Sequence, residues 1–159
     1  VRSTNWNCWV GANFGAYGLN LDHKHLAEMR EHALLDAKPV FSPSVGYFER
    51  GMLVCVPLHQ RAFCRAVGGV DVHAALAAHY AGETFVTVRP MNDTSALREG
   101  FLEPEALNHT NRLELFVYAN DAQAQLMLIA RLDNLGKGAS GAALQNMNLA
   151  LGLPEDRGL

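Results

Sequence analysis

RLELFVYA, residues 112–119, and AQLMLIARL, residues 124–132, are two apolar segments separated by a short connection that contains Asn120 and Asp121. Both segments are rich in leucine, isoleucine, valine and aromatic residues, and β-branched and aromatic side chains favour strands. Asparagine and aspartate are common in turns because their side chains bond to nearby backbone groups. The pattern therefore predicts an antiparallel hairpin.

The segments around this hairpin predict an α+β fold. GMLVCVPL, residues 51–58, is a continuous apolar run short enough for a strand covered on both faces. TFVTVR, residues 84–89, predicts a further strand that Pro90 ends. Asp71 is expected to cap a helix, and helices are expected at residues 25–34, 71–80 and 137–151. This order favours a mixed, largely antiparallel sheet with helices packed on one face.

The size and charge of the chain limit the possible classes of function. Its 159 residues, 49% of them hydrophobic, suffice for one domain, so residues 1–159 are expected to form a single domain. The formal net charge of −3 disfavours nucleic acid and an anionic membrane surface as partners. No apolar run approaches the roughly 20 residues of a membrane span, and the first residues lack a signal-peptide pattern. We therefore expect a soluble, cytoplasmic protein.

The cysteines are Cys8, Cys55 and Cys64. Their odd number and the lack of a CxxC spacing argue against a disulfide framework and against a zinc ribbon. We expect reduced thiols with a structural or incidental role, because no motif around them supports a nucleophile.

Small residues fill the first turns of the last predicted helix. KGASGAA, residues 137–143, carries glycine at positions where a helix usually has better helix formers, and each interior glycine costs roughly 0.5–1 kcal/mol relative to alanine. One interpretation is tight packing of this helix against the sheet. The other is a ligand, such as a nucleotide, lying against the helix N-terminus. The residues alone leave both open.

Three blocks of sequence resemble the N-acetyl-gamma-glutamyl-phosphate reductases of arginine biosynthesis. DNLGKGASGAALQNMNLALGLPEDRGL, residues 133–159, resembles the C-terminal signature of that family. HKHLAEM, residues 23–29, resembles the family's HRHTPEI, and FSPSVGYFERGMLVCV, residues 41–56, resembles the segment that ends in RGILAT. Thr110 and Asn111 also resemble a short family motif, although His109 stands where the family usually has glycine.

The resemblance implies a domain like the C-terminal domain of glyceraldehyde-3-phosphate dehydrogenase. It also implies an enzyme that reduces N-acetyl-L-glutamyl 5-phosphate to the semialdehyde with NADPH. The family's glycine-rich dinucleotide fingerprint and its GCYP-type cysteine motif do not occur in this chain. We therefore expect the C-terminal catalytic and dimerisation portion of a longer reductase. Without its N-terminal NADP-binding domain, this portion is expected to be inactive.

The pair His23 and His25 has three interpretations from the residues alone, which are a metal site, a proton-transfer site and a structural pair. In an extended segment, side chains at i and i+2 share a face, so both rings could point into one site. Adding Glu28 gives HxHxxE, which is not a standard zinc spacing, and we expect no metal. The resemblance implies that His23 and His25 transfer protons and that Glu28 orients one imidazole.

Three further residues receive roles through the resemblance. Arg50, just before the strand at 51–58, is expected to bind the phosphate or carboxylate of the substrate, because guanidinium groups hold such anions in a bidentate manner. Asn134 and Gly138 are expected to meet the nicotinamide end of NADP. For Arg50 and Asn134, a purely structural role as an edge charge and a turn residue is the alternative.

The predicted hairpin also suggests assembly. Phe116 and Tyr118 would share one face with Glu114 and leave aromatic area exposed, so we expect a homo-oligomer that associates through this face. The alternative is that both faces of the hairpin are covered within one subunit. The alternative to an enzyme is a non-enzymatic module that keeps the fold for assembly or small-molecule binding. The residues do not reveal the oligomeric state or which histidine acts as the acid.

Overall fold

A computed structural model describes residues 13–159. Packing contacts group these residues into two compact units, one up to Glu49 and one from Arg50 to Leu159. Each unit is described by itself, and the single domain expected for residues 1–159 stays a prediction. Within the described residues, no helix has both the length and the apolar composition needed to cross a membrane.

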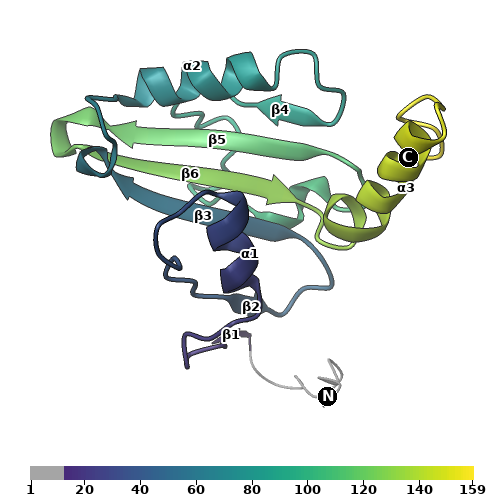
Figure 1. Cartoon of the computed structure of the whole chain (residues 1–159), viewed down its shortest axis with the longest axis horizontal. Coiled ribbons are helices and arrows are strands. Elements are labelled where there is room, and N and C mark those ends of the chain that lie inside the picture. Colours follow the sequence, from purple (N-terminus) through teal and green to yellow (C-terminus); the bar gives the residue numbers. More distant parts are fainter. Residues whose placement is uncertain (1–12) are drawn as a thin grey trace. The chain divides into compact units, whose positions relative to one another are not determined.

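The second unit is built on a four-stranded mixed sheet (Figure 1). Its strands, in spatial order, are β3 (Met52–His59), β6 (Gln125–Leu132), β5 (Leu113–Asn120) and β4 (Val86–Val88). Strands β3, β6 and β5 run antiparallel to their neighbours, and β4 pairs with β5 in parallel. The α+β fold and the hairpin of β5 and β6 are thus confirmed.

A short 3-10 turn, η4 (Asp121–Gln123), closes the hairpin. The side chain of Asn120 accepts a hydrogen bond from the backbone N–H of Gln123, 3.2 Å away. Ala124 follows with φ of 53°, a left-handed conformation that lets the chain reverse direction. The turn-forming role expected of Asn120 therefore has a physical cause in its side-chain oxygen.

One expectation about the sheet is wrong, because Phe116 is buried. Phe116 and Val117 are each only 1% exposed, although they point to opposite faces of β5. The guanidinium of Arg131 lies 5.1 Å from the centre of the Phe116 ring, and the hydroxyl of Tyr118 donates to the carbonyl of Asp93. The connection after β4, which includes Asp93, thus covers the aromatic face that was expected to remain exposed.

The helix α2 (Gly69–His79) packs against β5. A side chain at Gly69 would collide with the Cβ of Ala119, so this position needs glycine for the helix to approach the strand. The N-cap is Gly68, and Asp71 accepts a hydrogen bond from its N–H at 2.9 Å. Asp71 therefore stabilises the helix start from the third helical position, and the expectation that it is the cap itself is wrong.

The C-terminal segment starts with a π-helical turn, η5 (Gly136–Ser140), which continues into α3 (Gly141–Ala150). The buried side chain of Asn148 donates to the carbonyls of Glu155 and Arg157 and so holds the last residues against α3. The predicted helix at 137–151 is confirmed in position, but its first turn is wider than an α-helix. Short 3-10 turns also occur as η2 (Gln60–Ala62) and η3 (Pro104–Leu107).

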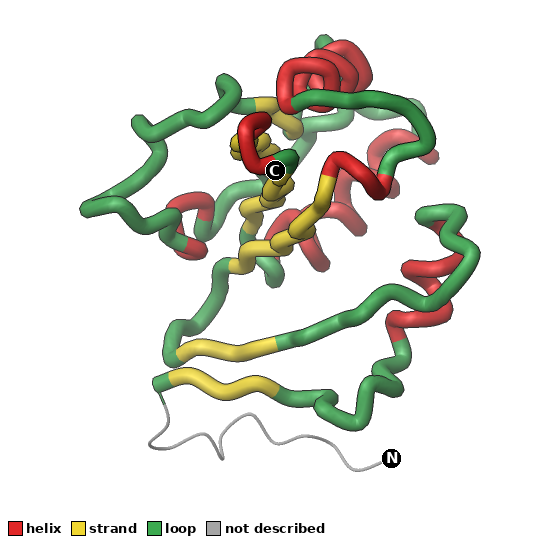
Figure 2. The backbone as a smooth tube through the Cα atoms, turned by 90° about the vertical axis from the view of Figure 1, so that its left-hand side faces the viewer, coloured by secondary structure: helices red, strands yellow, loops and turns green. Residues whose placement is uncertain are grey.

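The first unit contains a small antiparallel ladder between β1 (Phe14–Ala16) and β2 (Ser44–Gly46). Figure 2 shows these two strands side by side, with the chain between them forming a long excursion. That excursion carries the helix α1 (His25–His32), whose Leu26 is 3% exposed. The helix was expected to reach residue 34, but it ends at His32 and Leu34 has a left-handed φ of 52°.

Candidate functional site

His23 and His25 lie together at the start of α1. Their ring centroids are 4.7 Å apart in an edge arrangement, and Phe41 packs against His23 at 5.0 Å. The intervening Lys24 has helical backbone angles, φ −53° and ψ −32°. The extended geometry expected for this pair is therefore wrong. The two rings are neighbours because the helix begins here and not because they share one face of a strand.

One hydrogen bond distinguishes the two histidines. The backbone N–H of His25 donates to Nδ1 of His23 at 3.3 Å. A nitrogen that accepts a hydrogen bond carries no proton, so the neutral His23 ring carries its proton on Nε2. His23 is half-buried and His25 is exposed. This arrangement gives His23 a held ring with one N–H that can donate a hydrogen bond.

Glu28 does not join this pair within the described part of the chain. Its side chain is exposed, and none of the hydrogen bonds described for residues 13–159 links it to an imidazole. Among the same residues, no three histidine, cysteine, aspartate or glutamate side chains are arranged to hold a metal ion. The role expected for Glu28 stays a prediction.

Arg50 belongs to a polar cluster in the second unit. Its Nη1 lies 3.6 Å from Oδ2 of Asp133 and 3.3 Å from Nδ1 of His109. The Arg50 side chain is 22% exposed, whereas that of Asp133 is fully buried. Arg50 comes just before β3, Asp133 comes just after β6, and these two strands are neighbours. The pairing of β3 and β6 therefore brings the two charges together.

The carboxylate of Asp133 holds this cluster together, and no role was predicted for it from the sequence. Its carboxylate accepts hydrogen bonds from the backbone N–H groups of His109, Leu135 and Gly136. Burial by itself would raise the pKa of Asp133, but these three donors and the charge of Arg50 together hold the pKa below its ordinary value. An aspartate between a strand and a glycine-containing turn, as in DNLG, was the only signal in the sequence.

The side chain of Asn134 forms a hydrogen bond with the backbone just before β3, as expected for its structural alternative. Its Oδ1 accepts a hydrogen bond from the backbone N–H of Gly51 at 2.8 Å. Gly51 has φ of 109°, and a Cβ there would lie 2.7 Å from the carbonyl oxygen of Pro104. Only glycine fits this position, so the backbone next to Arg50 is fixed both by its conformation and by Asn134.

The small residues of η5 and α3 divide into two kinds. A Cβ at Gly136 would lie 2.8 Å from the carbonyl oxygen of Thr110, and one at Gly141 would collide with the side chain of Asn111. These two glycines serve close packing, as the first interpretation expected. Gly138 is different, because it is exposed and the nearest atom to its Cβ position lies at 3.4 Å. Packing within this unit does not require a glycine there.

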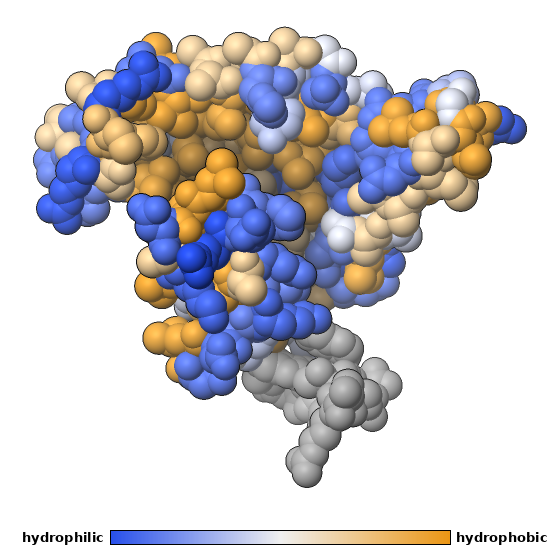
Figure 3. Space-filling view, in the orientation of Figure 1, coloured by the Kyte–Doolittle hydropathy of each residue, from blue (hydrophilic) through white to orange (hydrophobic). Residues whose placement is uncertain are grey.

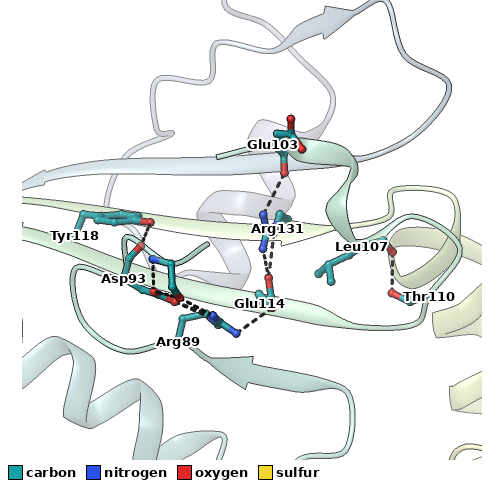
Figure 4. Close-up of polar contacts among 9 residues, drawn as sticks. Arg89, Asp93, Glu103, Leu107, Thr110, Glu114, Tyr118 and Arg131 are labelled. Carbon is teal, nitrogen blue, oxygen red and sulfur yellow. Dashed lines mark hydrogen bonds and ion pairs between the residues drawn. The ribbon is translucent and has the colours of Figure 1, made fainter. Parts of the chain in front are cut away.

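A second polar network lies on the face of the sheet that carries Phe116 (Figure 4). Glu114 accepts two hydrogen bonds from Arg131, and Arg89 lies between Glu114 and Asp93. The Ser95 hydroxyl contributes most to holding the pKa of Asp93 below its ordinary value, despite the opposing effect of burial, and Arg89 adds to this lowering. The charges alternate in sign, so each buried group has an opposite neighbour. The network was not predicted, and removing one of its charges would leave a buried partner uncompensated.

Two cysteines lie within the described residues, and the structural or incidental role expected for them stays a prediction. Cys55 and Cys64 are free thiols. Burial raises the pKa of the Cys55 thiol, which keeps it protonated at neutral pH. Cys8 lies outside the described residues.

Comparison with known proteins covers most of the chain. Residues 1–134 match the family model described as "Semialdehyde dehydrogenase, dimerisation domain". The chain is 52% identical over 147 residues to the N-acetyl-gamma-glutamyl-phosphate reductase 2 of a Nostoc species, which is 92% of this chain and 46% of that protein. It is 50% identical over 135 residues to the reductase of Rhizobium etli, which is 85% of this chain and 43% of that protein. The chain thus spans less than half the length of these relatives, and the resemblance seen in the sequence motifs is confirmed.

Proposed function

The chain belongs to the semialdehyde dehydrogenase dimerisation-domain family, and from this premise we propose that it is the catalytic and dimerisation portion of an N-acetyl-gamma-glutamyl-phosphate reductase. The reaction would convert N-acetyl-L-glutamyl 5-phosphate to N-acetyl-L-glutamate 5-semialdehyde at the expense of NADPH, in the cytoplasm. The observation that carries the proposal is the 52% identity over 92% of this chain to a protein of that name.

The substrate is an anion with a phosphate and a carboxylate, and Arg50 is the residue proposed to bind one of them. Its guanidinium is placed by Asp133 and remains 22% exposed, so it can meet an anion while its position is fixed. Preorganisation of this kind lowers the cost of ordering a long side chain on binding.

Hydride transfer to an acyl carbon places negative charge on its oxygen, and a nearby hydrogen-bond or proton donor can stabilise that charge. His23 is the residue proposed for this role, because the backbone N–H of His25 contacts its Nδ1 and leaves Nε2 as the nitrogen that can donate to the oxygen. His25 would support this geometry through its backbone and its ring. Glu28 is proposed to orient one imidazole when the site is complete.

NADPH supplies the hydride when it is bound, and two residues of this chain fit the proposed contact with it. Gly138 is exposed and carries no side chain, so a flat ring could approach the backbone there. Asn134 is fixed in place by Gly51 next to this turn. The nucleophilic cysteine and most of the NADP site are expected in the N-terminal part of the parent protein.

A non-enzymatic module for assembly or ligand binding is the second candidate, and the match of residues 1–134 to a model described as a dimerisation domain is the observation that favours it. Determining the parent reading frame upstream of Val1 separates the two. A glycine-rich βαβ unit followed by a GCYP-type motif supports the reductase. A frame without both features supports the second candidate.

A further inference from the structure

His109 has an unusual backbone conformation. Its φ is 62°, in the left-handed region that few residues with side chains adopt, although histidine is among the more tolerant. Its N–H donates to Oδ2 of the buried Asp133 at 2.8 Å, which holds the backbone in this conformation. Strained positions of this kind concentrate where a side chain has a function.

The held backbone places the His109 ring beside Arg50. Nδ1 of His109 lies 3.3 Å from Nη1 of Arg50, and the ring is exposed to solvent. Arginine only donates hydrogen bonds and stays charged, so in this contact the imidazole is neutral and Nδ1 is the acceptor. The neutral ring therefore occupies one donor of the guanidinium.

We propose that His109 is a second residue of the anion site at Arg50 and that its protonation controls that site. A proton from solvent on Nδ1 turns the acceptor into a donor, which ends the hydrogen bond with Arg50. The two groups then present N–H donors to the same solvent-exposed space, where a phosphate or sulfate with several negative oxygens can bridge them. The inference rests on the proposed role of Arg50 in binding an anionic group.

The charges around this site explain why protonation has a large effect. Two charged side chains contact His109 or its backbone N–H, namely Arg50, before β3, and Asp133, after β6. The positive charge of Arg50 and the negative charge of Asp133 cancel while His109 is neutral. Protonation of His109 adds one positive unit to the charge of this cluster. An anion is therefore attracted more strongly when the ring is charged.

Sulfate is a suitable probe, because it keeps two negative charges from about pH 5.5 to about pH 8, the range in which an ordinary histidine changes charge. Its dissociation constant for the full 159-residue chain is measured by NMR titration at both pH values and at constant ionic strength. We expect binding roughly tenfold tighter at the lower pH, the scale of one added charge at a partly exposed site.

Two variants test the assignment. His109→Asn keeps a side chain that tolerates the left-handed backbone but carries no titrating group, and it should bind sulfate with the same affinity at both pH values. Arg50→Gln should lose the binding at both. The proposal is wrong if the parent chain shows no pH dependence, or if His109→Asn keeps all of it. Equal binding by Arg50→Gln and the parent chain would overturn the anion site itself.

The result is independent of turnover. Sulfate binding needs neither NADPH nor the nucleophile, so an inactive parent protein would contradict the proposed reductase without changing this measurement. His109→Gly provides a second test, since it removes the ring and relieves the backbone strain. It should remain folded and lose the pH dependence as well, and retention of the full dependence in folded His109→Gly would contradict the proposal.

Discussion

The backbone N–H of Gly51 and the side-chain oxygen of Asn134 are hydrogen-bonded at 2.8 Å across 83 residues of sequence. This bond joins the start of β3 to the turn that follows β6. It fixes the backbone next to Arg50, the residue proposed to bind substrate. Gly51 and Asn134 therefore support both the fold and the position proposed for Arg50 in binding.

Replacing Asn134 by alanine should cost about 1–2 kcal/mol of unfolding free energy, because the N–H of Gly51 loses its partner. Urea denaturation followed by circular dichroism measures this loss. Asn146→Ala, at an exposed position on α3, is the control and should change stability by less than about 0.5 kcal/mol. Equal stability of the two variants would show that the bond contributes nothing.

Asp133 should make stability depend on pH in the acid range. Its pKa is lowered in the folded state, so its stabilising contribution is present above the ordinary aspartate pKa and is lost as pH falls through the folded value. Stability should therefore drop below about pH 4.

Asp133→Asn tests this assignment. The variant should be about 3 kcal/mol less stable at neutral pH, because Arg50 and three N–H groups lose a buried carboxylate. It should also lose less stability on acidification than the parent chain. The exposed Asp156→Asn is the matched control. An identical acid response in the parent and Asp133→Asn would contradict the role of Asp133.

Association through Phe116, as expected from the sequence, needs revision because this side chain is buried. A charged residue at Phe116 should unfold the chain and not merely separate subunits. Val54 and Val56 are 42% and 43% exposed and lie on the opposite face of the sheet, next to Ala130 and Leu128. Apolar surface is also visible over the sheet and along α3 (Figure 3).

The double variant Val54→Asp, Val56→Asp should therefore shift the chain toward monomer. Sedimentation equilibrium at tens of micromolar, roughly the range where an interface of −6 to −7 kcal/mol appears, measures this shift. Leu35→Asp, at an apolar side chain of similar exposure in the first unit, is the control and should not change the oligomeric state. An unchanged oligomer in the double variant would place the interface elsewhere.

The two histidines should differ in the parent enzyme. His23→Ala should lower turnover by about 10²-fold or more, the usual effect of losing a general acid, with little loss of stability. His25→Ala should have a smaller effect, since it removes the ring packed at 4.7 Å from His23 but keeps the backbone N–H that donates to His23. His32→Ala, at the end of α1, is the control for losing an exposed histidine. Near-parent rates for both His23→Ala and His25→Ala would support a structural pair.

Local patterns in the sequence were sufficient for the hairpin, the strand after Arg50 and the order of helices, because each depends on short-range periodicity and turn residues. The alternation in β5 showed that Phe116 and Tyr118 share a face, but it could not show that the connection carrying Asp93 covers it. Asp133 was missed because its contacts with His109 and Arg50 form only when β6 pairs with β5 on one side and with β3 on the other. The extended geometry predicted for His23 and His25 was wrong because Lys24, just before the helix start at His25, already has helical backbone angles.

The most direct test of the account is NADPH oxidation with N-acetyl-L-glutamyl 5-phosphate, followed by absorbance for the full-length parent protein and for the 159-residue chain at equal concentration. The account predicts substrate-dependent turnover by the parent and none by the chain alone, because the GCYP-type motif and the glycine-rich fingerprint are missing from it. Clear turnover by the chain alone, or no turnover by a folded parent protein, would contradict it.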